Sequence, residues 1–198
     1  MTRIMFQYLI AEVKTESPFG FKSDKTWDEL FSIANLIGDM ISIHTDSRWG
    51  GSFQLIEKAK KLTNKPILAK GFHENDDLVK NAFNAGANFV LTVGRRSGYL
   101  PEKCLIEPYD LQQLKQYTSP NQWIVWNSRN LLDGSRKQET IEQARQIHSS
   151  GFLCQASNIK SYEDVFQRSD AVLIGEHLPS FFMKYKECCK HQIFVKGN

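Results

Sequence analysis

The sequence predicts an α/β protein of the (β/α)8 TIM barrel class, with a truncated N-terminus and with helix four reduced to a loop. Three observations support this prediction. Eight short apolar segments recur along the chain, amphipathic helical patterns lie between most of them, and polar residues follow nearly every segment. Continuous apolarity is typical of strands buried on both faces, as in parallel sheets. Eight units favour closure into a barrel, and an open doubly wound sheet is the second candidate.

The eight predicted strands are rich in β-branched and aromatic residues, which favour extended backbone. They lie at residues 8–14, 40–44, 66–70, 88–93, 104–107, 123–126, 152–156 and 171–174. The 198 residues contain no linker and no low-complexity segment between these strands. We therefore expect one barrel domain over residues 1–198.

Apolar residues repeat at helical spacing in most of the intervals between the strands. The predicted helical segments are residues 27–37, 55–62, 78–83, 111–114, 141–147 and 162–166, with a last helix at about 179–189. The interval from Gly94 to Lys103 is the exception, because it is short and contains Gly98 and Pro101, which disfavour a helix. A reduced fourth helix also explains a chain shorter than the roughly 250 residues typical of this class.

Composition argues against several classes of protein. The net charge of +3 comes without a dense Lys/Arg stripe, so a nucleic-acid partner is not indicated. No run of about 18 apolar residues predicts a membrane span, and the N-terminal residues lack a signal-peptide pattern. The cysteines at 104, 154, 188 and 189 have no CxxC spacing, which is typical of a reduced cytoplasmic protein. The scattered histidines predict no metal site, and a monomer and a homodimer both remain open.

Two opposite charges end the first predicted strand. Glu12 and Lys14 lie at alternate positions, so in a strand their side chains point to the same side. Charges are expensive to bury unless they are paired or used. The stretch therefore predicts a functional site at the carboxyl end of this strand, and the alternative is an edge strand with two solvated charges.

Polar residues and glycines also follow the other predicted strands, at the end of a βα barrel where chemistry collects. They are His44, Thr45, Asp46, Lys70, Gly94, Arg95, Glu107, Asn127, Arg129, Ser157, Asn158, Gly175 and Glu176. Two lysines and two glutamates on one rim predict proton transfer, because crowded cations lower each other's pKa and burial raises that of a carboxylate. Gly175 lies where barrels commonly bind phosphate. Taken singly, Lys70 also fits an exposed loop lysine, and Glu107 a helix cap.

Six segments in this order form a familiar set of motifs. They are EVKTESP at 12–18, SIHTDSRWGGS at 42–52, PILAKGF at 66–72, LIEPYDLQQL at 105–114, NSRNL at 127–131 and DAVLIGEHL at 170–178. They resemble E-I-K-x-x-S-P, S-V-L-T-x-x-x-(F/W)-x-G-S, P-V-L-R-K-D-F, L-V-E-V-H-x-x-x-E-L, N-(N/S)-R-D-L and D-A-V-L-(I/V)-G-E-S-L of the indole-3-glycerol phosphate synthase family. The resemblance runs from about residue 8 to 184 and implies the same barrel fold.

The resemblance implies catalytic roles for five residues. Lys70 would be the general acid that protonates the ketone oxygen of the substrate. Lys14 would pair with the substrate's carboxylate and share the acid role. Glu107 would be the general base for a dehydration, and Glu12 a supporting carboxylate. Asn127 would orient the substrate near Lys70.

The resemblance also implies how the two ends of the substrate are held. Ser17, Ser157 and the backbone amides near Gly175 would bind its phosphate, and Trp49 and Phe72 would flank its anthranilate ring. The remaining substrate- and phosphate-binding candidates on the rim are Arg129, Asn158 and Glu176.

The activity implied is that of a carboxy-lyase of tryptophan biosynthesis. It closes the ring of 1-(2-carboxyphenylamino)-1-deoxyribulose 5-phosphate with loss of CO₂ and water, by general acid–base catalysis. No cofactor or metal is implied, because the protonated carbonyl and the amine nitrogen serve as the electron sink. The implied partner is a small phosphorylated anion, with neither nucleic acid nor membrane.

Several positions depart from the family pattern. Only residues 1–7 precede the first predicted strand, where the family has a longer segment. Ala156 and Asn158 replace a glutamate and a glycine, and Gly71 and Asn130 each replace an aspartate. These changes leave two alternatives: a divergent barrel that acts on another phosphorylated small molecule, and a non-catalytic relative.

Overall fold

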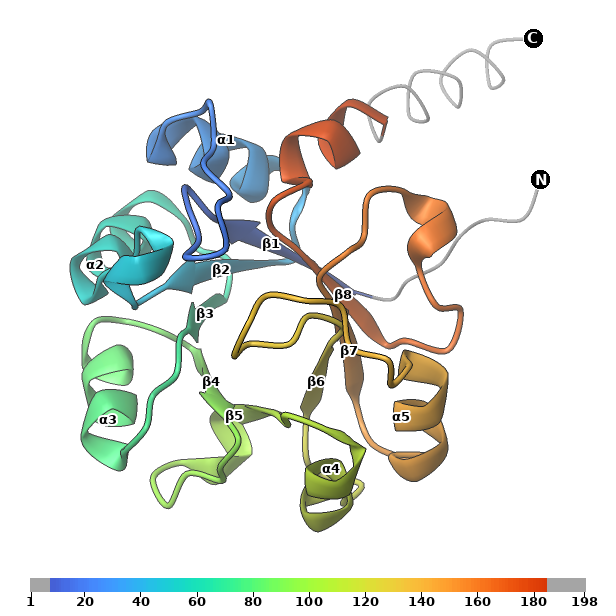
Figure 1. The fold of residues 1–198 in the computed structure, drawn as a ribbon. Coiled ribbons are helices and arrows are strands. Elements are labelled where there is room, and N and C mark those ends of the chain that lie inside the picture. Colours follow the sequence, from blue (N-terminus) through green and yellow to red (C-terminus); the bar gives the residue numbers. More distant parts are fainter. Residues whose placement is uncertain (1–7, 185–198) are drawn as a thin grey trace, which may run out of the picture.

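Eight parallel strands close into a barrel in chain order, with β8 pairing back onto β1 (Figure 1). The computed structural model describes residues 8–184. The strands are β1 (Tyr8–Val13), β2 (Met40–His44), β3 (Ile67–Lys70), β4 (Phe89–Val93), β5 (Cys104–Glu107), β6 (Ile124–Asn127), β7 (Leu153–Ala156) and β8 (Ala171–Ile174). The predicted barrel is confirmed, and each predicted strand is present within one residue of its predicted bounds.

Helices cover the outside of the barrel (Figure 1). They are α1 (Trp27–Ile37), α2 (Phe53–Leu62), α3 (Asp76–Asn84), α4 (Leu111–Tyr117) and α5 (Ile141–Ile147), with 3-10 turns η1 (Ser47–Trp49), η2 (Pro101–Lys103) and η3 (Tyr162–Asp164). Between β4 and β5, where we expected no full helix, there is only η2. Residues 178–184 are helical, and the rest of the last predicted helix, with the cysteines at 188 and 189, lies outside the described residues. No helix within residues 8–184 is long and apolar enough to cross a membrane.

The helix predicted at 162–166 is wrong, because only the single turn η3 forms there. Gln155 takes the place of helical hydrogen bonding at the end of this turn. Its Nε2 donates to the Asp164 carbonyl at 2.8 Å, and its Oε1 accepts from the Phe166 N–H at 2.8 Å. Side-chain bonds of this kind offer the backbone an alternative to a helix.

Each of the helices α1 to α5 begins at a side-chain cap that also ends the preceding loop. The caps are Thr26, Ser52, Asn75, Asp110 and Thr140, each accepting from the backbone N–H three residues further on. Loops that run from strand ends to these caps form the rim of the barrel. The caps therefore fix the ends of the loops that surround the site.

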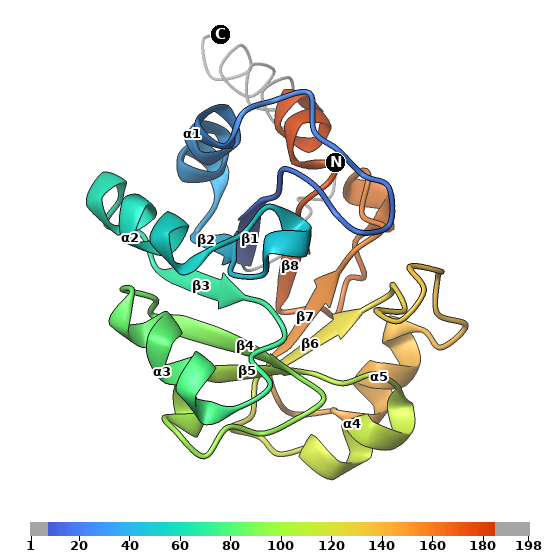
Figure 2. The same cartoon turned by 60° about the vertical axis from the view of Figure 1, so that its left-hand side comes forward.

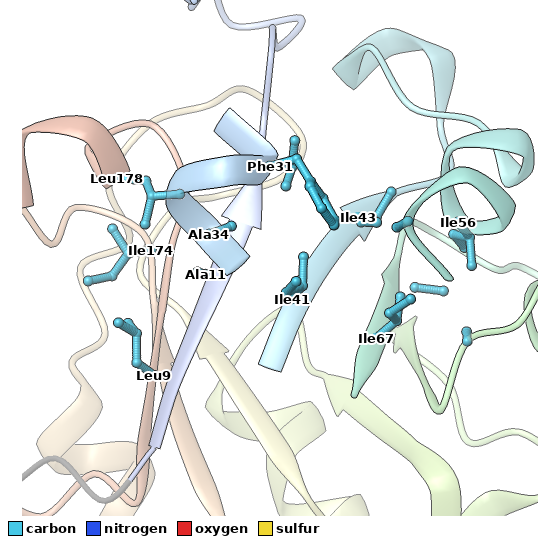
Figure 3. Close-up of a cluster of buried hydrophobic side chains, with 14 of the residues drawn as sticks. Leu9, Ala11, Phe31, Ala34, Ile41, Ile43, Ile56, Ile67, Ile174 and Leu178 are labelled. Atoms are coloured by element: carbon cyan, nitrogen blue, oxygen red, sulfur yellow. The ribbon is translucent and has the colours of Figure 1, made fainter. Parts of the chain in front are cut away.

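Side chains alternate along each strand between two apolar layers. One layer packs the strands against the helices, and Figure 3 shows part of it, including Phe31 of α1 beside Ile41 and Ile43 of β2. The other layer fills the barrel interior. Its buried members are Ile10, Met40, Leu68, Leu91, Val93, Leu105, Val125, Cys154, Ala156, Ala171 and Leu173. The same alternation, continued toward the carboxyl ends, decides which polar side chains point inward.

The loops that follow β1 and β6 pack together at the carboxyl end of the barrel (Figure 2). Gly134 of the β6 loop has φ +78°, and a Cβ there would lie 2.5 Å from the Phe19 ring of the β1 loop. The Arg129 guanidinium lies 6.0 Å from the centre of the same ring. Glycine thus allows two loops that are distant in sequence to enclose one side of the rim.

Candidate active site

The apolar barrel interior ends in a polar layer at the carboxyl ends of the strands. This strand-borne layer consists of Glu12, Lys70, Glu107 and Asn127, each two residues beyond an interior apolar side chain on β1, β3, β5 and β6. His44 adds a fifth polar group from β2, and it lies opposite Lys70 in the β2–β3 register. Polar residues from distant parts of the chain therefore lie together at one end of the barrel, as predicted.

Lys70 forms a buried ion pair with Glu12. Its Nζ lies 3.1 Å from Glu12 Oε1, and Glu12 is 3% exposed. Burial opposes the ammonium charge, but the negative charges of Glu12 and Glu107 outweigh burial and raise the pKa of Lys70. The expectation that crowded cations lower this pKa is therefore wrong for Lys70. The ammonium group is held in the protonated form that a general acid requires.

Glu107 has one oxygen engaged and one without a protein partner. Asn127 Nδ2 donates to Oε1 at 2.9 Å, while Oε2 is buried without a hydrogen-bond partner within residues 8–184. The side chain is 1% exposed, and burial raises its pKa against the opposing charge of Lys70. Asn127 is fixed in turn, because its Oδ1 accepts from the Arg129 N–H at 2.9 Å. A carboxylate with a raised pKa and an available oxygen is suited to general-base chemistry.

A second set of charges lies beside β8, on loops. Glu176 accepts from Lys14 Nζ at 2.7 Å and from both terminal nitrogens of Arg129 at 2.5 and 2.8 Å. Burial alone would raise the pKa of Glu176, but these hydrogen bonds and charges lower it to about 2. Burial, assisted by Lys70, lowers the pKa of Lys14, as predicted for crowded cations. We call Lys14, Arg129, Ser157, Asn158 and Glu176 the cationic corner.

Two adjoining hollows open over these groups. The central hollow is lined by Lys14, Phe19, His44, Trp49, Lys70, Gly71, Phe72, Leu91, Val93, Glu107, Asn127, Arg129, Leu131 and Ser157. The corner hollow is lined by Glu12, Lys14, Arg129, Ser157, Asn158, Ile159, Leu173, Ile174, Gly175, Glu176 and His177. Lys14, Arg129 and Ser157 line both, so the hollows are continuous. Among residues 8–184, no group of three or more His, Cys, Asp and Glu is arranged to hold a metal ion.

The backbone of the corner hollow turns sharply after β7. Ser157 and Asn158 have φ of 65° and 56°, in the left-handed region. The Asn158 side chain is turned onto the β6 loop, where its Nδ2 donates to Ser128 Oγ at 2.8 Å. Position 175, which also lines this hollow, requires glycine, because a Cβ there would lie 2.2 Å from Glu12 Oε2. The corner is thus shaped by backbone conformation as well as by charge.

Of the remaining predicted binding residues, some line the hollows and others do not. Trp49 and Phe72 both line the central hollow, with ring centres 5.7 Å apart, so they form one continuous aromatic wall. Ser17 lines neither hollow, and its buried hydroxyl has no hydrogen-bond partner within residues 8–184. The structure therefore does not bring Ser17 to the site. On the rim, Arg95 pairs with Asp76 of α3 and lies outside both hollows.

His73 lies beside the site and was not predicted. Its Nδ1 donates to the Leu91 carbonyl at 2.6 Å, and its Nε2 lies 3.1 Å from Thr45 Oγ1. Thr45 Oγ1 is also 3.2 Å from the Lys70 carbonyl, so the contacts connect His73 to the end of β3. His73 has a φ of 39°, in the left-handed region, and nothing in the sequence pattern indicates such a conformation.

The closed barrel and its buried lysine and glutamate layer define a (β/α)8 barrel protein with a candidate active site at the carboxyl ends of its strands. The indole-3-glycerol phosphate synthase of Sulfurisphaera tokodaii is 30% identical to this chain over 205 residues, which cover 90% of this chain and 81% of that protein. This chain therefore belongs to the indole-3-glycerol phosphate synthase family, as the motifs predicted.

Other relatives agree with this assignment. The indole-3-glycerol phosphate synthase of Picrophilus torridus is 27% identical over 190 residues, covering 87% of this chain and 76% of that protein. That of Campylobacter concisus is 28% identical over 194 residues, covering 85% and 73%. A solved structure of 3-hexulose-6-phosphate synthase has a TM-score of 0.59 at 12% identity, covers 88% of this chain and 100% of its own, and shows the shared fold. No family model matches the sequence.

Proposed function

We propose that this protein is an indole-3-glycerol-phosphate synthase, which closes 1-(2-carboxyphenylamino)-1-deoxyribulose 5-phosphate to indole-3-glycerol phosphate with release of CO₂ and water. One observation supports this above the others. Lys70, with a raised pKa, shares a buried layer with Glu107, whose Oε2 has no partner within the described residues. An acid and a base are thus available at the floor of one hollow.

The two hollows match the two ends of such a substrate. The aromatic wall of Trp49 and Phe72 offers an apolar surface to an aryl ring. The corner hollow offers Ser157, the backbone at Gly175 and the charge of Lys14 to a phosphate or a carboxylate. The ketone of the connecting chain then lies over the strand-borne layer.

The proposed ring closure begins with proton transfer from Lys70 Nζ to the ketone oxygen. The ring carbon that bears the carboxylate attacks the ketone carbon, so a carbon–carbon bond forms as the carbonyl π bond becomes a hydroxyl. The bond to the carboxylate then breaks and CO₂ leaves, and its electron pair restores the aromatic ring. Glu12 stabilises the ammonium group of Lys70 before this transfer, through the 3.1 Å ion pair.

The proposed dehydration follows on the new five-membered ring. Lys14, whose pKa is lowered, gives the proton with which the hydroxyl leaves as water. Glu107 removes a proton from the neighbouring ring carbon, and the carbon–carbon double bond of indole forms. One proton is taken up overall, because an anionic carboxylate departs as neutral CO₂.

The direct test is a turnover assay with the synthetic substrate, following the fluorescence of the indole product. We expect turnover by the wild-type protein and a loss of at least about a hundredfold in Lys70→Ala, since the acid is removed. Lys115→Ala is the matched control, because this lysine of α4 is exposed and remote from both hollows. Absence of turnover at high concentrations of folded wild-type protein would refute the proposal. Turnover of a different phosphorylated ketose instead would indicate a changed substrate.

A further inference from the structure

His44 is an additional polar residue of the central hollow. It ends β2 and pairs in register with Lys70 of β3, so both side chains point into the upper end of the barrel. It is 5% exposed, and it lines the central hollow together with Trp49 and Phe72. The imidazole is therefore placed on the aromatic side of the hollow, beside the layer that holds Lys70.

The imidazole of His44 stacks on the Trp49 ring. Its ring lies parallel to the Trp49 ring, with centres 4.9 Å apart and an interplanar angle of 2°. Its Nδ1 is buried and has no hydrogen-bond partner within residues 8–184. In the neighbouring layer Lys70 is hydrogen-bonded to Glu12 and Asn127 to Glu107, and Glu107 Oε2 likewise has no partner in the described part of the chain. A buried polar group without a partner is uncommon and calls for an explanation.

The surroundings of His44 keep its imidazole neutral. Burial lowers its pKa well below the usual value, and the charges of Lys70 and Lys14 act in the same direction. His73 also lowers it, while Asp46 opposes the shift. A neutral imidazole has one N–H donor and one acceptor nitrogen. A hydroxyl group has the same two capacities, whereas a carboxylate on the substrate is matched by the ammonium groups instead.

We propose that His44 is a specificity-determining residue, which hydrogen-bonds a hydroxyl group on the aromatic ring of the substrate. The inference rests on the proposed function and deepens it: among arylamino ketose phosphates, the site binds one with a hydroxylated ring more tightly than the unsubstituted one. The aromatic wall of Trp49 and Phe72 holds the ring, and the imidazole recognises its substituent. A site built to hydrogen-bond a substrate hydroxyl discriminates strongly against the analogue that lacks it.

The test compares ligands that differ only in the ring hydroxyl. Substrate analogues with the ketone reduced to an alcohol do not react, so their dissociation constants are measured by calorimetry for an unsubstituted ring and for each position of one hydroxyl. We expect one hydroxylated analogue to bind the wild-type protein about tenfold more tightly or better than the unsubstituted one. Equal or weaker binding of every hydroxylated analogue would overturn the inference.

Two variants separate hydrogen bonding from stacking. His44→Phe keeps an aromatic ring against Trp49 but removes both nitrogens, so we expect the preference for the hydroxylated ring to disappear and the melting temperature to be kept. His44→Gln keeps a donor and an acceptor and is expected to retain part of the preference. An undiminished preference in folded His44→Phe would show that another group recognises the hydroxyl.

The same ligands distinguish failure of this inference from failure of the proposed function. If neither the plain nor the hydroxylated substrate is turned over by wild-type protein, the proposed function fails, while the affinity ratio still decides the role of His44. If both are turned over with equal kcat/KM and bind equally, the inference alone fails. If no analogue binds, the inference is overturned, and the turnover assay still decides the proposed function.

Discussion

The strand-borne layer and the cationic corner hold glutamates of opposite character. Glu107, in the layer, has a pKa raised by burial and an oxygen without a hydrogen-bond partner in the described chain. Glu176, in the corner, accepts three hydrogen bonds from Lys14 and Arg129, and its pKa is lowered to about 2. Two carboxylates on one rim thus have pKa shifts of opposite direction, which would suit proton transfer at Glu107 and a fixed charge at Glu176.

The difference follows from the elements that hold the two side chains. Glu107 ends a strand, where alternation directs it into the barrel beside other strand ends. Glu176 follows β8 in a loop, where two long cationic side chains can reach it from the β1 and β6 loops. The strand end buries Glu107 with one hydrogen-bond donor, whereas the loops bring two cationic side chains to Glu176. We therefore expect substitutions in the layer to affect chemistry, and those of Arg129, Asn158 and Glu176 in the corner to affect stability and binding.

The largest expected effect is that of Glu107→Gln. The amide keeps the size of the side chain and can accept the Asn127 hydrogen bond, but it cannot remove a proton. We expect kcat to fall by about 10² to 10⁴, the usual contribution of a general base. The folded state should not be weakened, because a buried charge is removed. Steady-state kinetics and thermal unfolding of the variant measure both effects.

Glu102→Gln is the control for this substitution, because Glu102 of η2 is exposed. An unchanged kcat in Glu107→Gln would show that Glu107 of the strand-borne layer, like Glu176 of the cationic corner, does not carry out proton transfer. It would also support the view that the protein is a non-catalytic relative.

The strand-borne layer could be predicted from the sequence because it depends on periodicity. Once eight apolar segments are assigned to parallel strands, alternation directs Glu12, Lys70, Glu107 and Asn127 to one end of the barrel interior. The motif resemblance then assigned them roles. The direction of the Lys70 pKa could not be predicted in the same way, because it depends on two carboxylates that only the closed barrel brings near.

The loop regions were less predictable for physical reasons. The contacts of Glu176 depend on which rotamers Lys14 and Arg129 adopt across three loops. Ser17 was assigned to phosphate by its motif alone, and the turn that follows β1 buries it away from both hollows. The placement of His73 involves a left-handed backbone conformation, for which a histidine gives no sequence signal.

The second prediction concerns how stability depends on pH in the two regions. The pKa of Glu176 falls from an ordinary 4.5 to about 2 on folding, so the unfolded state binds more protons between these values. Its contribution is complete above about pH 4.5 and is lost as the pH falls toward 2. Glu107 has a raised pKa, so its contribution to stability is lost as the pH rises above its ordinary value.

Urea unfolding from pH 2 to pH 7 tests both signs with conservative variants. Glu176→Gln should cost about 2 kcal/mol at pH 7, the usual range for hydrogen bonds to a charged group, and should flatten the acid limb of the stability curve. Glu107→Gln should leave the acid limb intact and increase stability at pH 7. Parallel curves for wild type and Glu176→Gln would contradict the assigned pKa.

The smallest expected effect is that of Asn158→Gly in the cationic corner. The substitution removes the hydrogen bond to Ser128 Oγ, worth about 1 kcal/mol, but glycine adopts the φ of 56° without the strain of a side chain. These terms oppose each other, so the free energy of unfolding should change by less than about 1 kcal/mol. The amide already points onto the β6 loop, so we also expect KM to change by less than about threefold. A tenfold change in KM, equivalent to about 1.4 kcal/mol, would show instead that Asn158 touches the substrate and that the corner recognises it through side chains as well as backbone.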